Sequence, residues 1–190
     1  MRWCGRRSRW LDSCSISPRG PSEVKALLQR VASARVEVGG AIVGAINHGL
    51  LVLIGIEPDD ERASADRLLQ RLLKYRVFND AQGRMNASLQ DVDGGLLLVS
   101  QFTLAADTRK GLRPGFSTAA PPRQAEALFD YLLGQAQQLH PQVSSGRFGA
   151  DMQVHLVNDG PVTLSWARPY SATLLRATSP PSEWAITWWP

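Results

Sequence analysis

Two uninterrupted apolar runs in the middle of the chain constrain its fold more than any other feature. Residues 50–56 and 95–99 contain only aliphatic side chains and glycine. Runs of this kind, without polar alternation, are typical of strands buried on both faces. Polar Ser100, Gln101 and Thr103 follow the second run at once. A buried polar group costs free energy unless it finds a partner. We therefore expect residues 94–104 to form a buried strand whose polar end either caps the sheet or binds a substrate.

Shorter patterns predict the strands around these two. Residues 25–31 and 34–38 are typical of strands, and residues 41–46 of a third. Gly39-Gly40 predicts a hairpin turn, because primed turns need positive φ. Residues 78–91 are rich in turn-forming residues. Residues 151–157 and 162–164 predict two further strands on either side of a Gly-Pro pair.

Two amphipathic helices complete the expected fold. Pro58-Asp59-Asp60 opens one and Pro121-Pro122 the other, and both show apolar residues at helical spacing. These residues are Ala65, Leu68, Leu69, Leu72 and Leu73 in the first helix, and Ala125, Leu128, Phe129, Leu132, Leu133, Ala136 and Leu139 in the second. We expect an α+β fold, with a largely antiparallel or mixed, barrel-like sheet and two helices packed on it.

Composition excludes several kinds of chemistry. The 190 residues, 44% hydrophobic, suit one globular domain, and no apolar run is long enough to span a membrane. The net charge of +4 lies at the ends, +3 in residues 1–23 and +1 in residues 167–190, so the body is neutral. Both cysteines precede residue 24, which leaves the body without a thiol nucleophile. His48, His140 and His155 are scattered and show no metal-ligand spacing, so we predict neither metal nor cofactor.

A second motif, Asn158-Asp159-Gly160-Pro161-Val162-Thr163, stands between two β-branched runs. An X-Pro bond adopts the cis form at little cost, and glycine permits a tight, exposed corner. Further segments share this order along the chain: Gln29-Arg30-Val31, Gly83–Asn86, Ala106-Asp107-Thr108 with Arg113-Pro114, Gly146-Arg147-Phe148 and Asp151–Val154. Together with Ser100-Gln101-Phe102-Thr103-Leu104, these segments resemble the bacterial D-aminoacyl-tRNA deacylases over residues 24–166.

The resemblance implies an enzyme that hydrolyses the ester of D-aminoacyl-tRNA, and of mischarged glycyl-tRNA, in translational proofreading. It implies a catalytic segment of Ser100, Gln101, Phe102 and Thr103, in which the N–H groups of Phe102 and Thr103 hold the carbonyl. The family's threonine at the position of Thr103 has been assigned as nucleophile. A threonine hydroxyl needs an activating base, and the sequence offers none. We therefore expect water, aided by the 2′-hydroxyl of the terminal adenosine, to attack.

The resemblance also implies how chirality is read. Gly160-Pro161 would be cis and would enter the pocket of the neighbouring subunit, so that a cytoplasmic homodimer shares its two sites. Arg30 would orient this corner, and Phe148 and Met152 would lie near the pocket, although both suit a core equally well. For tRNA, the candidates are Arg109, Lys110 and Arg113, listed together because they follow the catalytic segment directly; a basic turn is just as often simply solvated.

The two ends fall outside the resemblance, and we expect residues 1–23 and 167–190 to be disordered. Val24 stands where the family's initiator is expected, which favours an over-extended gene start over a targeting segment. For the tail, a frameshifted or read-through terminus is the expectation. Two other functions compete with the deacylase: an RNA-binding, translation-associated module with the same fold and no turnover, and the animal-type paralogue that removes a wrong L-amino acid.

Overall fold

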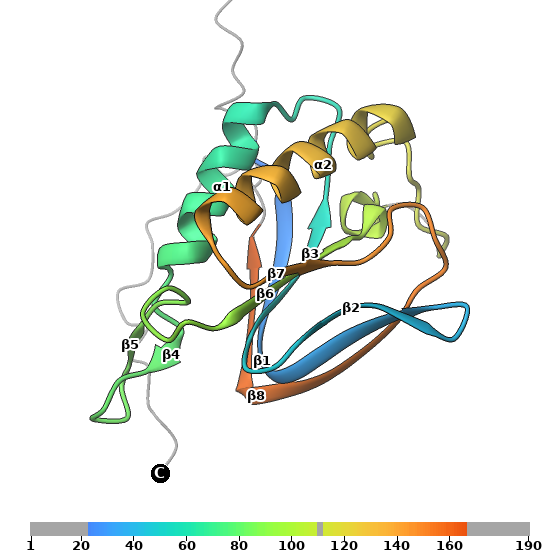
Figure 1. The fold of residues 1–190 in the computed structure, drawn as a ribbon. Helices are drawn as coiled ribbons and strands as arrows, with labels where there is room; N and C mark the ends of the chain where they lie inside the picture. The colour runs from blue at the N-terminus through green and yellow to red at the C-terminus, as the bar shows by residue number, and fades with distance from the viewer. Residues whose placement is uncertain (1–22, 110–111, 167–190) are drawn as a thin grey trace, which may run out of the picture.

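The computed structural model describes residues 23–109 and 112–166 (Figure 1). Its elements in chain order are β1 (Lys25–Val38), β2 (Ala41–Ile46), β3 (Gly49–Gly55), α1 (Arg62–Lys74), β4 (Phe78–Asn79), β5 (Met85–Ala87), β6 (Gly95–Ser100), the 3₁₀ helix η1 (Phe102–Ala105), α2 (Pro122–Leu139), β7 (Val143–Ser145) and β8 (Gln153–Trp166). The disorder expected for residues 1–23 and 167–190 concerns segments that, apart from Glu23, lie outside the described residues.

The main sheet is mixed and nearly closes on itself. Its order is β2-β1-β3-β6-β7, with β8 on the other edge of β1. The pairs made by β1 are antiparallel, whereas β3, β6 and β7 run parallel. β7 approaches β2, and Ser144 Oγ donates to the carbonyl of Ala45 at 2.9 Å. The predicted α+β fold with a barrel-like sheet and two helices is therefore confirmed.

The strong bend of β1 makes this closure possible. Its first half pairs with β3 and its second half with β2, while β8 follows it along nearly its whole length. Register shifts between Gln29 and Val31 and between Val31 and Ser33 interrupt the β1–β8 ladder. Such irregularities increase local twist and bending. The expected break between residues 31 and 34 is thus a bend within one continuous strand.

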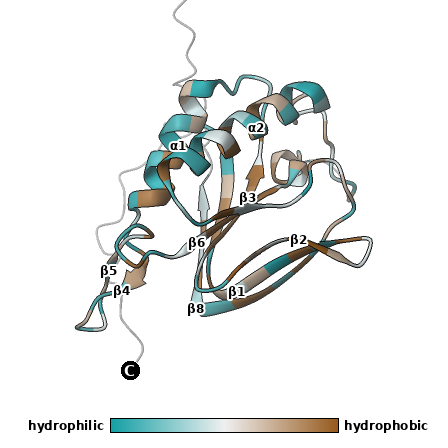
Figure 2. Ribbon diagram, in the orientation of Figure 1, coloured by the Kyte–Doolittle hydropathy of each residue, from teal (hydrophilic) through white to brown (hydrophobic). Residues whose placement is uncertain are grey.

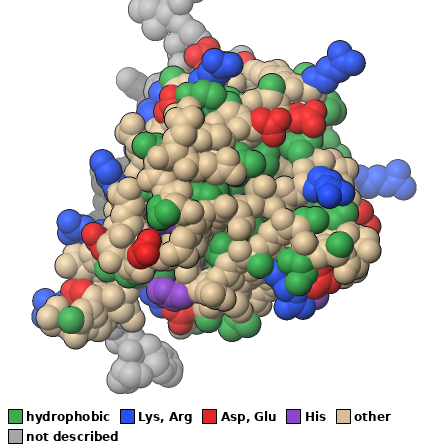
Figure 3. All heavy atoms as spheres, in the orientation of Figure 1, with side chains coloured by type: hydrophobic (Ala, Val, Ile, Leu, Met, Phe, Trp, Pro, Cys, Tyr) green, Lys and Arg blue, Asp and Glu red, His purple; other side chains and the backbone are tan. Residues whose placement is uncertain are grey.

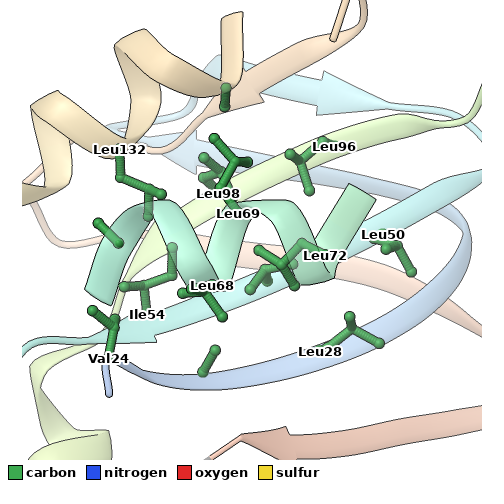
Figure 4. Packing of buried hydrophobic residues seen from close by; sticks show 14 of the residues in the cluster. Val24, Leu28, Leu50, Ile54, Leu68, Leu69, Leu72, Leu96, Leu98 and Leu132 are labelled. Carbon is green, nitrogen blue, oxygen red and sulfur yellow. The ribbon is translucent and has the colours of Figure 1, made fainter. Parts of the chain in front are cut away.

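Both helices lie on the same side of the sheet (Figure 1). Their apolar faces meet the strands, and their polar faces, teal in Figure 2, turn outward. Figure 4 shows Leu68, Leu69 and Leu72 of α1 packed with residues of β3 and β6. Because side chains alternate across a strand, Leu50 and Ile54 point to the helices, whereas Leu51 joins a second cluster inside the curved sheet.

Three predicted boundaries need correction. The strand expected over residues 94–104 ends at Ser100, and η1 follows. α1 begins at Arg62 rather than at Pro58, because Glu61 caps it and its N–H donates to Ser64 Oγ at 2.9 Å. The strands expected on either side of Gly160-Pro161 are one strand, β8.

Two smaller differences concern exposure and turns. Leu139, expected on the core face of α2, is 54% exposed at the last position of the helix. The turn-rich residues 78–91 contain the short antiparallel pair β4–β5. Among the residues that the structure describes, no helix combines the length and apolarity needed to cross a membrane.

Candidate active site

The segment after β6 leaves the sheet where the parallel strands end. Ser100 pairs with Ile54 at the last rung of the β3–β6 ladder. The N–H of Gln101 then donates to the carbonyl of Ile54 at 2.7 Å, and the chain turns into η1. Open α/β sheets bind ligands at the carboxyl ends of parallel strands. The turn therefore occupies a position suited to a site.

Two main-chain donors are free of the helix that they begin. The first hydrogen bond of η1 joins the N–H of Leu104 to the carbonyl of Gln101 at 3.2 Å. The N–H groups of Phe102 and Thr103 precede it, so neither has a partner within η1. Ser100 and Gln101 are half-buried, whereas Phe102 and Thr103 are exposed, which corrects the expectation that the polar side chains are buried. The burial that the apolar run predicts stops at Val99.

The side chain of Thr103 is held by an amide. Gln101 Nε2 donates to Thr103 Oγ1 at 2.5 Å. An amide N–H is a donor and cannot accept a proton from the hydroxyl. The three histidines lie elsewhere: His48 packs edge-on against Phe78, His140 Nε2 lies 2.6 Å from the carbonyl of Gly94, and His155 lies 3.5 Å from Glu37. This arrangement orients the Thr103 hydroxyl and gives it no general base.

Gly55, at the end of β3, lets η1 pack closely on the sheet. A Cβ placed on Gly55 would come 2.8 Å from Leu104 Cβ and 3.2 Å from the carbonyl oxygen of Gln101. Contacts this short do not occur without displacement of one partner. The absence of a side chain at Gly55 therefore fixes the depth at which the catalytic segment sits.

The predicted pocket residues lie near this same end of the sheet. Gly146 follows β7 and donates its N–H to the carbonyl of Leu98 at 2.9 Å. Phe148 is half-buried and its ring centroid lies 6.2 Å from that of Phe129. Met152 packs on the inner cluster, close to Gly146. Both side chains thus contribute to the core beside the catalytic segment.

An exposed aromatic pair borders η1 on the other side. Phe102 is 58% exposed and Phe116 is 41% exposed. Their rings meet edge to face, with centroids 5.0 Å apart. Exposed aromatic rings offer faces on which bases or other rings can stack. The segment that carries Phe116 was not recognised from the sequence as part of the site.

The Gly160-Pro161 bond is cis, and the corner that it makes is braced from within β8. Asn158 Oδ1 accepts the N–H of Val162 at 2.9 Å, and Asn158 Nδ2 donates to Thr163 Oγ1 at 3.0 Å. One amide side chain thus ties the strand together across Gly160 and Pro161, both of which are exposed. The contacts of Asn158 were not predicted, although the residue lies within the motif.

Arg30 holds the corner from the neighbouring strand. Its side chain is 7% exposed, and its Nε lies 3.0 Å from the carbonyl of Asp159 and 2.9 Å from Asp159 Oδ2. Arg30 Nη1 also donates to the carbonyl of Val77 at 2.6 Å. A buried guanidinium needs such partners to offset its desolvation. The arrangement links the corner to the segment that follows α1.

The two motifs lie at opposite ends of one chain. Arg30, beside the corner, pairs with Leu50, whereas Ser100 pairs with Ile54 at the other end of β3. At ~3.3 Å per residue, these rungs are about 13 Å apart along the strand. β1 and β3 also lie between β8 and β6. In Figure 1 the lower bend of β8 is correspondingly distant from the yellow-green turn of η1.

The candidate tRNA-binding cations differ in their surroundings. Arg109 forms a bidentate pair with Asp107, with distances of 2.8 and 2.7 Å. Arg113 is exposed, and Lys110 lies outside the described residues. Within residues 23–109 and 112–166, no three His, Cys, Asp or Glu side chains gather as a metal site would require.

Comparison with known proteins follows from this geometry. The fold and the two motifs define an ester-hydrolase type of site built from main-chain donors. The family model described as D-Tyr-tRNA(Tyr) deacylase matches residues 27–167. The chain belongs to this family, as the sequence motifs predict.

Bacterial relatives are similar over nearly their whole length. D-aminoacyl-tRNA deacylases of Pseudomonas fluorescens (strain Pf-5) and Stutzerimonas stutzeri (strain A1501) are 74% and 69% identical to the chain over 140 residues, which covers 74% of this chain and 97% of each relative. A solved structure named c-Myc DNA Unwinding Element Binding Protein is 40% identical, with a TM-score of 0.73, covering 76% of this chain and 99% of that one. A probable eukaryotic D-amino acid tRNA deacylase, 17% identical with a TM-score of 0.67, shares the fold.

Proposed function

We propose that the protein hydrolyses the ester bond of D-aminoacyl-tRNA to free D-amino acid and tRNA, and so removes D-amino acids before they enter translation. The free N–H groups of Phe102 and Thr103 at the carboxyl end of β6 carry this proposal. They are arranged as donors for an ester carbonyl oxygen. Membership of the D-Tyr-tRNA(Tyr) deacylase family supports the same substrate.

The mechanism uses the activated nature of the substrate. The two N–H groups bind the carbonyl oxygen and stabilise the negative charge that develops on it. Water attacks the carbonyl carbon, helped by the 2′-hydroxyl of the terminal adenosine, and the 3′-oxygen leaves. Thr103 positions a group rather than acting as nucleophile, because its hydroxyl accepts a hydrogen bond from Gln101 and has no base beside it.

Chirality is read by the corner of a second chain. Gly160-Pro161 cannot reach η1 of its own chain, because the motifs lie at opposite ends of β3. In a homodimer, the corner of one subunit enters the pocket of the other. Its main-chain carbonyls then crowd the face that an L side chain would occupy. Glycine has no side chain to reject, so glycyl-tRNA is also hydrolysed.

The outer edge of β8 supports such a dimer. Within the described residues β8 pairs with β1 alone, and its Leu156 and Val157 are 37% and 58% exposed. A groove of about 640 Å³ runs beside them. It is lined by Arg35 and His155, which contact Glu37 at 2.8 and 3.5 Å. The hydrogen bond from Arg35 lowers the pKa of Glu37 and keeps it ionised. An unpaired edge with apolar side chains and a charged rim suits association.

Deacylation of matched D-Tyr-tRNA and L-Tyr-tRNA tests the proposal and separates it from its rivals. The proposed enzyme, acting in the cytoplasm on translation substrates, hydrolyses the D ester and spares the L ester. A paralogue that removes L-amino acids would show the reverse preference. An RNA-binding module without turnover would hydrolyse neither, and that result would refute the proposal.

A further inference from the structure

The last turns of α1 carry an unusual concentration of positive charge. Residues 67–76 include Arg67, Arg71, Lys74 and Arg76 and contain no acid, although residues 24–166 as a whole are neutral. All four side chains are exposed. In Figure 3, Lys and Arg side chains stand along the left edge of the molecule, where α1 and the β4–β5 hairpin lie. Positive charge clustered on one face of a neutral domain indicates an anionic partner.

These cations line a surface groove. One hollow of about 310 Å³ is lined by Arg67, Gln70, Arg71, Lys74 and Tyr75. A second, of about 540 Å³, is lined by Lys74, Tyr75, Arg76, Val77, Met85, Val162 and Leu164. Because Lys74 and Tyr75 belong to both, the two hollows form one continuous groove, which we call the α1 groove.

The α1 groove leads to the Gly160-Pro161 corner. Val162, which follows Pro161 directly, lines its far end. Val77 lines the same end, and its carbonyl accepts the hydrogen bond from Arg30 that links this segment to the corner. A ligand in the groove therefore lies beside the corner, and in the proposed dimer it lies beside the pocket of the partner.

Aromatic rings accompany the cations. Tyr75 is 41% exposed, and its ring meets Trp166 edge to face with centroids 5.6 Å apart. The guanidinium of Arg71 lies 4.6 Å from the centre of the Trp166 ring. Cations that follow a backbone, together with an exposed aromatic ring, are typical of surfaces that bind single-stranded nucleic acid.

We propose that the α1 groove binds the phosphate backbone at the acceptor end of the tRNA whose aminoacyl group occupies the pocket of the partner subunit. This inference rests on the proposed function for its substrate. Lys74 and Arg76 contact phosphates, and Tyr75 contacts a base or sugar. Each chain then supplies the corner and the tRNA track for the site whose donors belong to its partner.

Paired variants test this assignment. Lys74→Gln with Arg76→Gln removes two positive charges from the groove. Arg62→Gln with Arg123→Gln removes two exposed charges from the starts of α1 and α2 and serves as the control of equal net charge. Binding of uncharged tRNA is measured by fluorescence anisotropy across a salt series. For the groove pair, we expect weaker binding and a slope of log K against log salt that is smaller by about 1 to 2, the value for two lost phosphate contacts.

A small substrate separates tRNA binding from chemistry. Hydrolysis of D-tyrosyl-adenosine is compared with that of D-Tyr-tRNA, and the groove pair should lose at least about fivefold more on the tRNA substrate, as expected when phosphate contacts are removed. The inference is overturned if the groove pair and the control pair show the same affinity and salt slope, even if the groove pair melts at lower temperature through loss of charge at the end of α1. If the wild type binds tRNA through the groove but hydrolyses no D ester, the inference stands and the proposed function fails.

Discussion

At the scale of single residues, the account depends on groups that act through the main chain. Phe102 and Thr103 contribute N–H donors, and Arg30 and Asn158 hold a backbone corner. No side chain among these is asked to take a proton from a nucleophile. Substitutions that leave the backbone in place should therefore be milder than those that move it.

Thr103→Ala tests this distinction. The substitution removes the hydroxyl that accepts from Gln101 and leaves both N–H donors. We expect deacylation of D-Tyr-tRNA to fall by less than about 100-fold, the lower end of the loss seen when an oxyanion donor is removed. Single-turnover rates provide the measurement. Isolation of a covalent aminoacyl ester on Thr103 of the wild type would contradict the water-based mechanism.

Gly160→Ala tests the corner. Gly160 has φ +128°, and an added Cβ would come 2.8 Å from Arg30 Nη2 and from Val162 Cγ2. We expect a stability loss of about 1–3 kcal/mol from the backbone conformation, and a larger loss of D-Tyr-tRNA deacylation. Gly83→Ala is the matched control, because Gly83 also has positive φ but has open space around it. Equal activity of the two variants would show that the corner has no part in the reaction.

At the scale of elements, periodicity in the sequence predicts what local packing decides. The hairpin turn, β2, the apolar faces of both helices and the buried part of β6 follow from patterns within a few residues. The extension of β6 to Leu104 is wrong, because β3 ends at Gly55 and offers no further partner to the strand. Asn158 and Arg30 could be placed in motifs, but their bonds to Val162, Asp159 and Val77 depend on register between distant strands.

Gly55→Ala tests the packing of η1 on β3. The new Cβ would push against Leu104 and the carbonyl of Gln101, which displaces the N–H donors. Overpacking of this kind costs about 1–3 kcal/mol. Because a displacement near 1 Å can cost about 100-fold in rate, we expect kcat for D-Tyr-tRNA to fall by about 10- to 100-fold.

Gly134→Ala supplies the control for that experiment. Gly134 lies within α2 with open space around it, so alanine there should raise the free energy of unfolding by up to about 1 kcal/mol. Unfolding is followed with denaturant and activity by single turnover. If Gly55→Ala retains wild-type kcat, the depth of η1 does not position the donors.

At the scale of the whole molecule, the folded unit and the charge follow different boundaries. The core closes within Val24–Trp166, and the family model matches residues 27–167. The net positive charge of the chain lies in the segments outside residues 24–166. The overall pI therefore says little about tRNA binding, which depends on local clusters such as the α1 groove.

Deletion of residues 1–23 and 167–190 together tests this boundary. We expect folding and D-Tyr-tRNA deacylation to be retained, since the ion pair lost with Glu23, 4.0 Å from Arg71, is exposed and weak. Thermal unfolding of the shortened chain is compared with that of the full chain. A fall in Tm of more than about 4 °C, on the order of 1 kcal/mol for a chain of this size, would show that one of the ends packs on the domain.

The most direct test of the shared site is a mixed dimer of two defective chains. Thr103→Arg obstructs the pocket beside the donors, and Gly160→Val disrupts the corner, so each homodimer should be inactive toward D-Tyr-tRNA. A heterodimer of the two retains one site with intact donors from one chain and an intact corner from the other. Random pairing in an equal mixture should therefore restore about a quarter of the wild-type sites. Heterodimers that are detected by native mass spectrometry but remain inactive would contradict the account.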